Sequence, residues 1–239
     1  MQFNSVFITG TDTAVGKTTV ACGIAAALNQ GGRSVGVIKP VETGCTALPN
    51  GQLQPEDAVR LKFFSGSHAS LDVICPYALH LPLAPLVAAQ YEGIAIELET
   101  IARCHDAVAA GHDVTLIEGA GGLLVPLTTE ATFADLAARL NVPVLVVVGS
   151  RLGALNHALL TVRYAQSVGL RVIGYVINFL TAAADEAART NVAVLTDWLG
   201  PPVGIVPHLS QIEMTATNRQ RLADVFTERV RIAELLVPR

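Results

Sequence analysis

A nine-residue stretch, GTDTAVGKT, begins at Gly10 and has the Gly-Lys-Thr ending of a phosphate-binding loop. The usual pattern places four residues between the first Gly and this ending, but here five separate Gly10 from Gly16. If Thr11 takes the place of the first Gly, the usual spacing returns, with a side chain at a position that normally has none. Gly16 lets the backbone approach a phosphate, Lys17 can reach the β- and γ-phosphates, and Thr18 can ligate Mg²⁺. We therefore interpret the stretch as a phosphate loop between a strand and a helix.

A second stretch, VIKPVETG, places Lys39 at the end of an apolar run. An ammonium at the end of a buried strand, beside a phosphate loop, could stabilise charge on a transferring phosphoryl group or on an acidic substrate. The alternative is a surface lysine whose long stem lets the charge reach solvent.

A third stretch, LIEGAGGLLVPL, places Glu118 at the end of another apolar run. Gly119, Gly121 and Gly122 would let the backbone pass close to a ligand. A carboxylate next to a phosphate loop is a natural ligand for Mg²⁺ or a holder of water. The alternative is a structural glutamate that caps a loop.

These residues need elements that bring them together, and the chain alternates short apolar runs with longer segments of helical period. The expected strands are Ser5–Thr9, Val35–Lys39, Val114–Glu118, Val144–Val148, Val172–Ile177 and Val203–Val206. The expected helices are Lys17–Gln30, Glu97–Ala110, Phe133–Leu140, Ala154–Val168 and Ala183–Leu199. Near-continuous apolar strands are typical of sheets covered on both faces. The pattern predicts an α/β fold with a doubly wound, mostly parallel sheet, as a single P-loop domain over residues 1–239.

Ligands bind beyond the carboxyl ends of the strands in such sheets. Most polar residues that interrupt the apolar runs fall at these ends, which predicts one site. The region from Thr43 to Gly93 is less regular and contains five prolines, so we expect a substrate-facing excursion with a short helix near Glu56–Phe64.

Composition excludes several classes of protein. The 239 residues are 51% apolar and carry a net charge of −4, with a pI near 5.8. Nucleic-acid binding needs a basic surface, so we expect no nucleic-acid partner. The four cysteines lack metal-ligand spacing and indicate free thiols in a reducing compartment. The N-terminal residues lack a basic leader and no apolar run approaches about 20 residues, so the sequence predicts a soluble, cytoplasmic protein without membrane contact.

Seven motifs together resemble the dethiobiotin synthetase family, in its order and over most of the chain. They are TGTDTAVGKT from Thr9, KPVETG from Lys39, EDA from Glu56, EGAGG from Glu118, VVGSRLGALNHALLT from Val147, GYVIN from Gly174 and GIVPHL from Gly204. The six-residue step from Gly10 to Gly16 is itself typical of that family.

The resemblance implies a homodimeric P-loop enzyme that converts 7,8-diaminononanoate, CO₂ and MgATP to dethiobiotin, ADP and phosphate. Its catalytic residues would be Lys39 and Lys17. Thr18, Asp57 and Glu118 would hold Mg²⁺, and Thr11, Lys39, Thr43, Gly153 and Asn156 would bind the diamine substrate, Asn156 from the neighbouring subunit. The nucleotide would be bound by Ala14, Val15, Gly16, Lys17, Thr18, Thr19, Asp57, Glu118, Gly119, Ala120, Gly121, Asn178, Pro207, His208 and Leu209.

Some features depart from the family's pattern or leave alternatives open. Ala14 stands where several relatives have an acidic residue, so nucleotide preference is open. The residues Leu81–Val87 would line the apolar part of the substrate groove or belong to the core. The stretch from Gln211 to Arg239 carries no recognisable motif. The alternative functions are a nucleotide-switch ATPase of the partitioning or septum-site type and the nucleotide-binding domain of a cobyrinate-type amidase.

Overall fold

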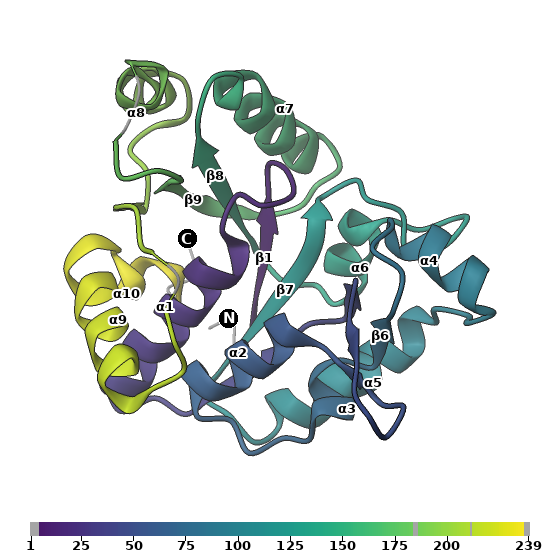
Figure 1. Cartoon of the computed structure of the whole chain (residues 1–239). Coiled ribbons are helices and arrows are strands. Elements are labelled where there is room, and N and C mark those ends of the chain that lie inside the picture. The colour runs from purple at the N-terminus through teal and green to yellow at the C-terminus, as the bar shows by residue number, and fades with distance from the viewer. Residues whose placement is uncertain (1–4, 184–185, 211, 237–239) are drawn as a thin grey trace.

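A six-stranded parallel sheet forms the centre of the protein (Figure 1). The computed structural model describes residues 5–183, 186–210 and 212–236. The strand order is β10-β9-β8-β1-β7-β2, and every pair of neighbours is parallel. In chain order these strands are β1 (Ser5–Gly10), β2 (Val35–Ile38), β7 (Val114–Gly122), β8 (Val144–Ser150), β9 (Val172–Phe179) and β10 (Gly204–Val206).

Helices cover both faces of the sheet, as predicted. One face packs against α1 (Lys17–Gln30), α2 (Glu56–Ser65), α3 (Leu71–Ile74), α9 (Ala216–Arg229) and α10 (Ile232–Leu235). The other face packs against α4 (Pro85–Glu92), α5 (Leu98–Ala109), α6 (Phe133–Arg139), α7 (Ala154–Ser167) and α8 (Glu186–Leu199). Successive residues of a strand point to opposite faces, so Val6 and Ile8 belong to the first core and Phe7 to the second. The apolar runs of the sequence are therefore strands buried on both sides.

Two strand ends differ from prediction where the site lies. β2 ends at Ile38, so Lys39 is the first residue beyond the strand. β7 continues past Glu118 through the glycines to Gly122. The predicted helix from Ala183 begins at Glu186 in the structure, and residues 184–185 lie outside the described residues.

The region from Thr43 to Gly93 is more regular than predicted. β3 (Val41–Thr43) and β6 (Tyr77–Leu79) form a parallel pair, and β4 (Thr46–Ala47) and β5 (Leu53–Gln54) form an antiparallel one. Helices α2, α3 and α4 follow or lie between them. The predicted helix near Glu56–Phe64 is confirmed as α2. The four strands were not predicted because elements of two or three residues are too short to show a period. Pro85 does not interrupt α4 but begins it, as proline does at a first helical position.

The C-terminal stretch, which has no motif, completes the core. α9 lies along α1, on the opposite side from α2 (Figure 1). Gly23 in α1 faces the buried ring of Phe226 in α9, and a Cβ atom at Gly23 would lie 2.1 Å from that ring. The two helices can approach this closely only because residue 23 is a glycine. Gln211 and residues 237–239 lie outside the described residues.

Two expectations from the sequence concern the cysteines and membrane-spanning segments. All four cysteines are free, and three of them are buried. No helix in the described part of the chain combines the length and apolarity needed to cross a membrane.

The packing of α1 on α9 predicts that Gly23→Ala destabilises the protein. The added methyl group has no space, and overpacking costs about 1–3 kcal/mol, of which the better helix propensity of Ala returns about 1 kcal/mol. Because the Cβ atom would overlap a buried ring, the upper end of this cost applies and about 2 kcal/mol remains, so we expect a melting temperature lower by roughly 4–8 °C in thermal unfolding. Gly31→Ala is the matched control, because a Cβ atom there meets nothing closer than 3.4 Å. A Gly23→Ala protein as stable as wild type would contradict the packing.

Candidate active site

Lys39 and Glu118 meet at the carboxyl edge of the sheet because of strand register. Ile38 of β2 is paired with Ile117 of β7, so the next residue of each strand lies beside the other. The Lys39 ammonium donates to Glu118 Oε1 over 2.6 Å and to Asp57 Oδ2 of α2 over 2.8 Å. The side chain of Lys39 is 3% exposed and that of Glu118 is 1% exposed. The structure therefore excludes a surface lysine, and it shows Glu118 as a buried partner of Lys39 at the end of its strand.

The two carboxylates keep the Lys39 ammonium charged. Burial lowers the pKa of a lysine, but Glu118 and Asp57 outweigh it and raise the pKa of Lys39 above its ordinary value. Burial likewise favours a raised pKa for Asp57, yet the Lys39 charge outweighs it and lowers the pKa of that carboxyl. Lys39 is thus a fixed positive charge whose side chain is buried.

The phosphate loop joins β1 to α1 in a conformation that its glycine permits. Gly16 precedes α1 with a φ of 88°, and a Cβ atom there would lie 2.1 Å from the amide nitrogen of Asn178. Lys17 donates to the carbonyl oxygen of Asp12 over 3.1 Å, and the Thr18 hydroxyl donates to Glu118 Oε1 over 2.8 Å. The start of α1 is therefore tied to the same carboxylate as Lys39.

Lys17 is the more easily deprotonated of the two lysines. Burial lowers the pKa of Lys17 to about 8, and the nearby Lys39 charge acts in the same direction, while Glu118 opposes both. An anion bound against Lys17 would raise this pKa again, because an opposite charge favours the protonated form. Bound phosphate would therefore favour the charged form of Lys17 over a wider pH range than in the free protein.

Glu42 is a functional candidate that the sequence analysis missed. Its Oε1 accepts from the Asp57 amide over 2.8 Å and its Oε2 from the Ala58 amide over 3.0 Å. The carboxylate therefore satisfies two free N–H groups at the start of α2, where the N-cap position, Pro55, makes no side-chain hydrogen bond. Burial, with Asp57 adding, raises the pKa of Glu42 to about 7. No local capping pattern links residues so far apart; the only signal was an acid within the KPVETG motif.

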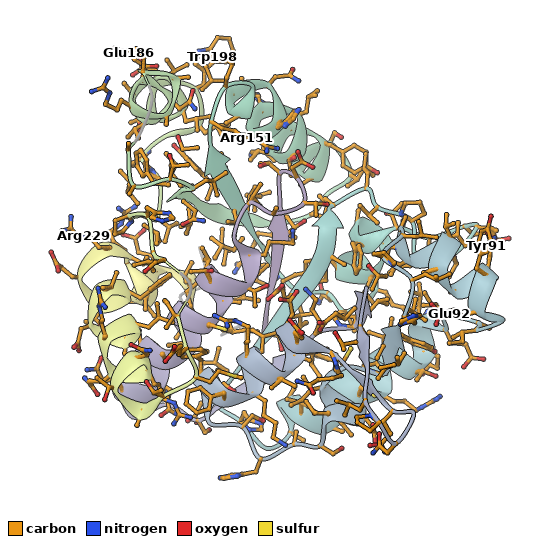
Figure 2. The ribbon with its side chains drawn as sticks, in the orientation of Figure 1. Tyr91, Glu92, Arg151, Glu186, Trp198 and Arg229 are labelled. Atoms are coloured by element: carbon orange, nitrogen blue, oxygen red, sulfur yellow. The ribbon has the colours of Figure 1, made fainter. Side chains whose placement is uncertain are left out.

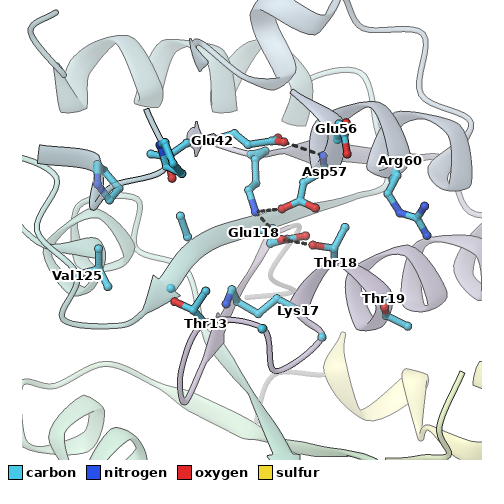
Figure 3. A pocket seen from close by; sticks show the side chains of 18 of the residues that line it. Thr13, Lys17, Thr18, Thr19, Glu42, Glu56, Asp57, Arg60, Glu118 and Val125 are labelled. Atoms are coloured by element: carbon cyan, nitrogen blue, oxygen red, sulfur yellow. Dashed lines mark hydrogen bonds and ion pairs between the residues drawn. The ribbon is translucent and has the colours of Figure 1, made fainter. Parts of the chain in front are cut away.

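These groups line one cavity of about 980 Å³ (Figure 3). The predicted site residues on its wall are Ala14, Gly16, Lys17, Thr18, Thr19, Lys39, Thr43, Asp57, Glu118, Ala120, Gly121 and Leu209. Residues that were not predicted include Thr13, Glu42, Glu56 and Arg60. Pro82, Leu83, Ala84 and Pro85 form an apolar part of the wall together with Val125. The segment Leu81–Val87 therefore contributes to the cavity, as one of its two predicted roles requires.

Other predicted residues lie outside this cavity. Val15, Gly119 and Asn178 are buried. The Asn178 amide donates to the Val15 carbonyl oxygen over 2.9 Å and so supports the phosphate loop from below. Pro207 and His208 line a separate cavity of about 590 Å³.

Three predicted substrate residues are also outside the cavity. The Thr11 amide donates to the Val147 carbonyl oxygen and ties the phosphate loop to β8. Gly153 and Asn156 are exposed at the start of α7. They do not line the cavity formed by this chain.

The loop before α7 is nevertheless attached to the phosphate loop. Arg151, at the end of β8 (Figure 2), pairs with the Asp12 carboxylate. The amide of Asn191 in α8 holds the Arg151 carbonyl oxygen at 2.9 Å. The ion pair between Arg151 and Asp12 was not predictable from the sequence, because it joins residues 139 positions apart.

One buried oxygen indicates that a cation fits beside Glu118. Glu118 Oε2 is buried and has no hydrogen-bond partner among the described residues. An unpaired buried acceptor costs free energy, and a cation or its bound water would satisfy it. The described residues include no cluster of three or more His, Cys, Asp or Glu side chains arranged around a metal. Two carboxylates and the Thr18 hydroxyl suit Mg²⁺, which keeps several water ligands.

The comparisons with known proteins agree on one family. The AAA domain family matches residues 4–216. The ATP-dependent dethiobiotin synthetase BioD of Anaeromyxobacter dehalogenans (strain 2CP-C) is 44% identical over 79% of this chain and 82% of its own. The BioD proteins of Thermodesulfovibrio yellowstonii and Bacillus subtilis (strain 168) are each 36% identical, over 96% and 86% of this chain and 97% and 88% of their own.

Solved structures confirm the P-loop fold. pNOB8 ParA, solved bound to nonspecific DNA, matches with a TM-score of 0.60 at 15% identity, over 97% of both chains. The MinC:MinD cell division protein complex of Aquifex aeolicus matches with a TM-score of 0.53 at 17% identity, over 92% of this chain and 86% of the other. At such low identity these matches show the fold alone.

The burial of Lys39 predicts that Lys39→Gln destabilises the free protein. The substitution leaves Glu118 and Asp57 without their counter-charge. Removing one partner of a buried pair costs about 3–5 kcal/mol, and the low end applies because Asp57 is 38% exposed. We expect a melting temperature in EDTA lower by roughly 6–12 °C. MgCl₂ without nucleotide should restore part of the loss, because the cation replaces the missing charge.

The control for this change is Lys62→Gln, on the same helix as Asp57. Lys62 is half-buried and is not part of the cavity wall, so its melting temperature should match wild type with and without MgCl₂. Equal stability of Lys39→Gln and Lys62→Gln, or an equal effect of MgCl₂ on both, would contradict the buried charge network.

Proposed function

The chain belongs to the ATP-dependent dethiobiotin synthetase family, and from that premise we propose how its own residues perform the reaction. The enzyme is a ligase of biotin biosynthesis that uses ATP. The observation that carries the residue assignment is the pair of lysines on one cavity: Lys17 on the phosphate loop and Lys39 across from it, between Glu118 and Asp57.

The reaction joins CO₂ to 7,8-diaminononanoate in three steps. One amine of the substrate adds to CO₂ and forms a carbamate. A carbamate oxygen then attacks the γ-phosphorus of ATP, so that ADP leaves and a carbamic–phosphoric anhydride forms. The second amine attacks the carbamoyl carbon, the C–O bond to phosphate breaks, and the ureido ring of dethiobiotin closes. The carbamate and the γ-phosphate are both negatively charged, so transfer between them needs concentrated positive charge.

The two lysines supply that charge from different directions. Lys17 would hold the β- and γ-phosphates, and Lys39 would face the carbamate and the transferring group. Thr18, Asp57 and Glu118 would hold Mg²⁺, which when bound neutralises phosphate charge and orients the nucleotide. The Lys39 side chain is buried, and a charge at a buried position has a larger effect than one in bulk solvent.

The remaining cavity wall suits the rest of the substrates. Thr43 would contact the diamine or its carbamate, and the apolar segment from Pro82 to Pro85 would cover the aliphatic chain. Ala14, Gly16, Thr19, Ala120, Gly121 and Leu209 would surround the nucleotide. Val15, Gly119 and Asn178 would support the phosphate loop and the adenine from buried positions. Pro207 and His208 would lie near the nucleoside.

Diamine-dependent ATP turnover tests this function against the nucleotide-switch and amidase alternatives. We expect the purified protein to release phosphate only when the diamine and bicarbonate are both present, with one dethiobiotin formed per ATP. Lys17→Ala should slow turnover by raising the activation free energy by about 3–4 kcal/mol, the effect of deleting one transition-state donor. Lys62→Gln should keep wild-type turnover. ATP hydrolysis that is indifferent to the diamine would overturn the assignment, and glutamine-dependent turnover would favour the amidase.

We further propose that the active enzyme is a homodimer in which Asn156 serves the neighbouring site. Asn156 is exposed at the start of α7 and does not line the cavity of its own chain. Leu152 and Leu160, four residues before and after it, are 84% and 61% exposed, so a partner that covers them would remove apolar surface from water. A second copy of the chain that covers them would bring Asn156 to the distal carboxylate of the diamine substrate.

Subunit complementation tests this arrangement. A heterodimer of Lys17→Ala and Asn156→Ala chains, co-expressed with two different tags, contains one site with both residues intact and one with neither. We expect about half the wild-type kcat per dimer, although each parent homodimer has little activity at low diamine concentration. If Asn156 serves its own subunit, the heterodimer will be no more active than its parents.

A further inference from the structure

Arg60 is a positive charge on the cavity wall to which neither the sequence motifs nor the proposed mechanism gives a role. It lies on α2, one turn after Asp57, and lines the cavity. Its side chain is half-buried, and its Nη2 donates to the Ile212 carbonyl oxygen over 3.0 Å. Its guanidinium carbon lies 6.0 Å from the centre of the Phe64 ring. These contacts hold the guanidinium in place at the cavity.

The Arg60 charge has no carboxylate partner in the described parts of the chain. No carboxylate in residues 5–183, 186–210 or 212–236 forms an ion pair with it, although Asp57 on the same helix pairs with Lys39. Guanidinium groups carry five N–H donors and bind phosphate in a bidentate fork. A half-buried, oriented and unpaired guanidinium on a ligand cavity is suited to an anionic ligand.

The position of Arg60 indicates which part of that ligand it meets. Arg60 and Thr19 lie on the same side of the cavity, beyond Thr18, whereas Thr13 and Lys17 lie toward the other side (Figure 3). In a phosphate loop the Lys reaches the β- and γ-phosphates and the following hydroxyl serves the metal. The wall beyond Thr18, where Arg60 meets Ile212, is therefore the end nearest the nucleoside.

We propose that Arg60 is a nucleotide-binding residue that contacts the α-phosphate of the bound nucleotide. This inference rests on the proposed function, because it needs a nucleotide in the cavity with its terminal phosphates at Lys17. Arg60 also ties α2 to the segment that contains Ile212, so it closes the nucleoside end of the cavity. It binds and positions the nucleotide and takes no part in phosphoryl transfer.

Nucleotide binding to the whole protein by isothermal titration calorimetry tests the proposal. Arg60→Gln keeps a hydrogen-bond donor for the Ile212 carbonyl oxygen but removes the charge. We expect its Kd for ADP to rise about tenfold, the loss of one charge-assisted contact, and its KM for ATP to rise by a larger factor than its kcat falls. The affinity for AMP, measured by competition, should fall by the same factor, because the α-phosphate is the only phosphate of AMP. Arg60→Lys should recover part of the affinity.

Controls separate a charge contact from a structural one. Lys62→Gln removes a charge from the same helix away from the cavity and should bind ADP as wild type does. The ratio of Kd between Arg60→Gln and wild type should shrink as KCl rises from about 0.05 to 0.5 M, because salt screens a Coulombic contact. A merely structural role predicts a ratio that does not respond to salt.

Three results would overturn the inference. An unchanged Kd for ADP in Arg60→Gln, while wild type binds ADP, would remove Arg60 from the nucleotide site and leave the proposed function standing. A weaker affinity of Arg60→Gln for ADP with an unchanged affinity for AMP would show that Arg60 contacts the β-phosphate instead. A wild-type protein that binds neither ADP nor ATP would overturn the proposed function, and this inference with it.

Discussion

The arrangement of the site depends on one buried ammonium, that of Lys39, held between Glu118 and Asp57. Three elements must be correctly placed for this contact to form. The register of β2 on β7 brings Lys39 beside Glu118, and α2 brings Asp57 to the other side. Glu42 fixes the start of α2 through the amides of Asp57 and Ala58, and Thr18 ties α1 to Glu118. The phosphate loop, the sheet edge and α2 are therefore coupled through one cluster of charges.

That cluster prepares the cavity for anions before any ligand binds. Lys39 stays charged because two carboxylates raise its pKa, whereas burial lowers the pKa of Lys17 to about 8. A phosphate bound at Lys17 would restore its full charge, and a cation at the unpaired Glu118 Oε2 would release Lys39 from part of its present pairing. The Lys39 ammonium is therefore charged before any ligand binds, and bound nucleotide and metal would let it turn toward the transferring phosphoryl group.

The sequence predicted the parts of the molecule that have a period or a motif. The buried strands and long helices follow from apolar runs, and α1 has the predicted bounds because the phosphate loop marks its start. Lys39, Glu118 and Lys17 were identified because charges that interrupt apolar runs at strand ends need a reason to be there. The resemblance to a family supplied Asp57, which no local pattern indicates.

The rest could not be predicted because it depends on contacts between distant segments. Glu42 caps a helix that begins fourteen residues later, and Arg60 matters only because α2 faces the phosphate loop. The pairing of β3 with β6 involves three residues on each side, which is too few for a periodic signal. The fit of Phe226 against Gly23 shows why a tail without motifs is still part of the core.

A crystal structure with Mg²⁺, a non-hydrolysable ATP analogue and the diamine substrate tests the role of the Lys39 cluster most directly. We expect the cation about 2.0–2.1 Å from Thr18 Oγ1, with Asp57 and Glu118 around it directly or through water. The Lys39 ammonium should turn from Asp57 toward the γ-phosphate and the substrate nitrogen. A cation bound elsewhere, with Lys39 still bridging both carboxylates and distant from the γ-phosphate, would contradict the assignment of Lys39 to phosphoryl transfer.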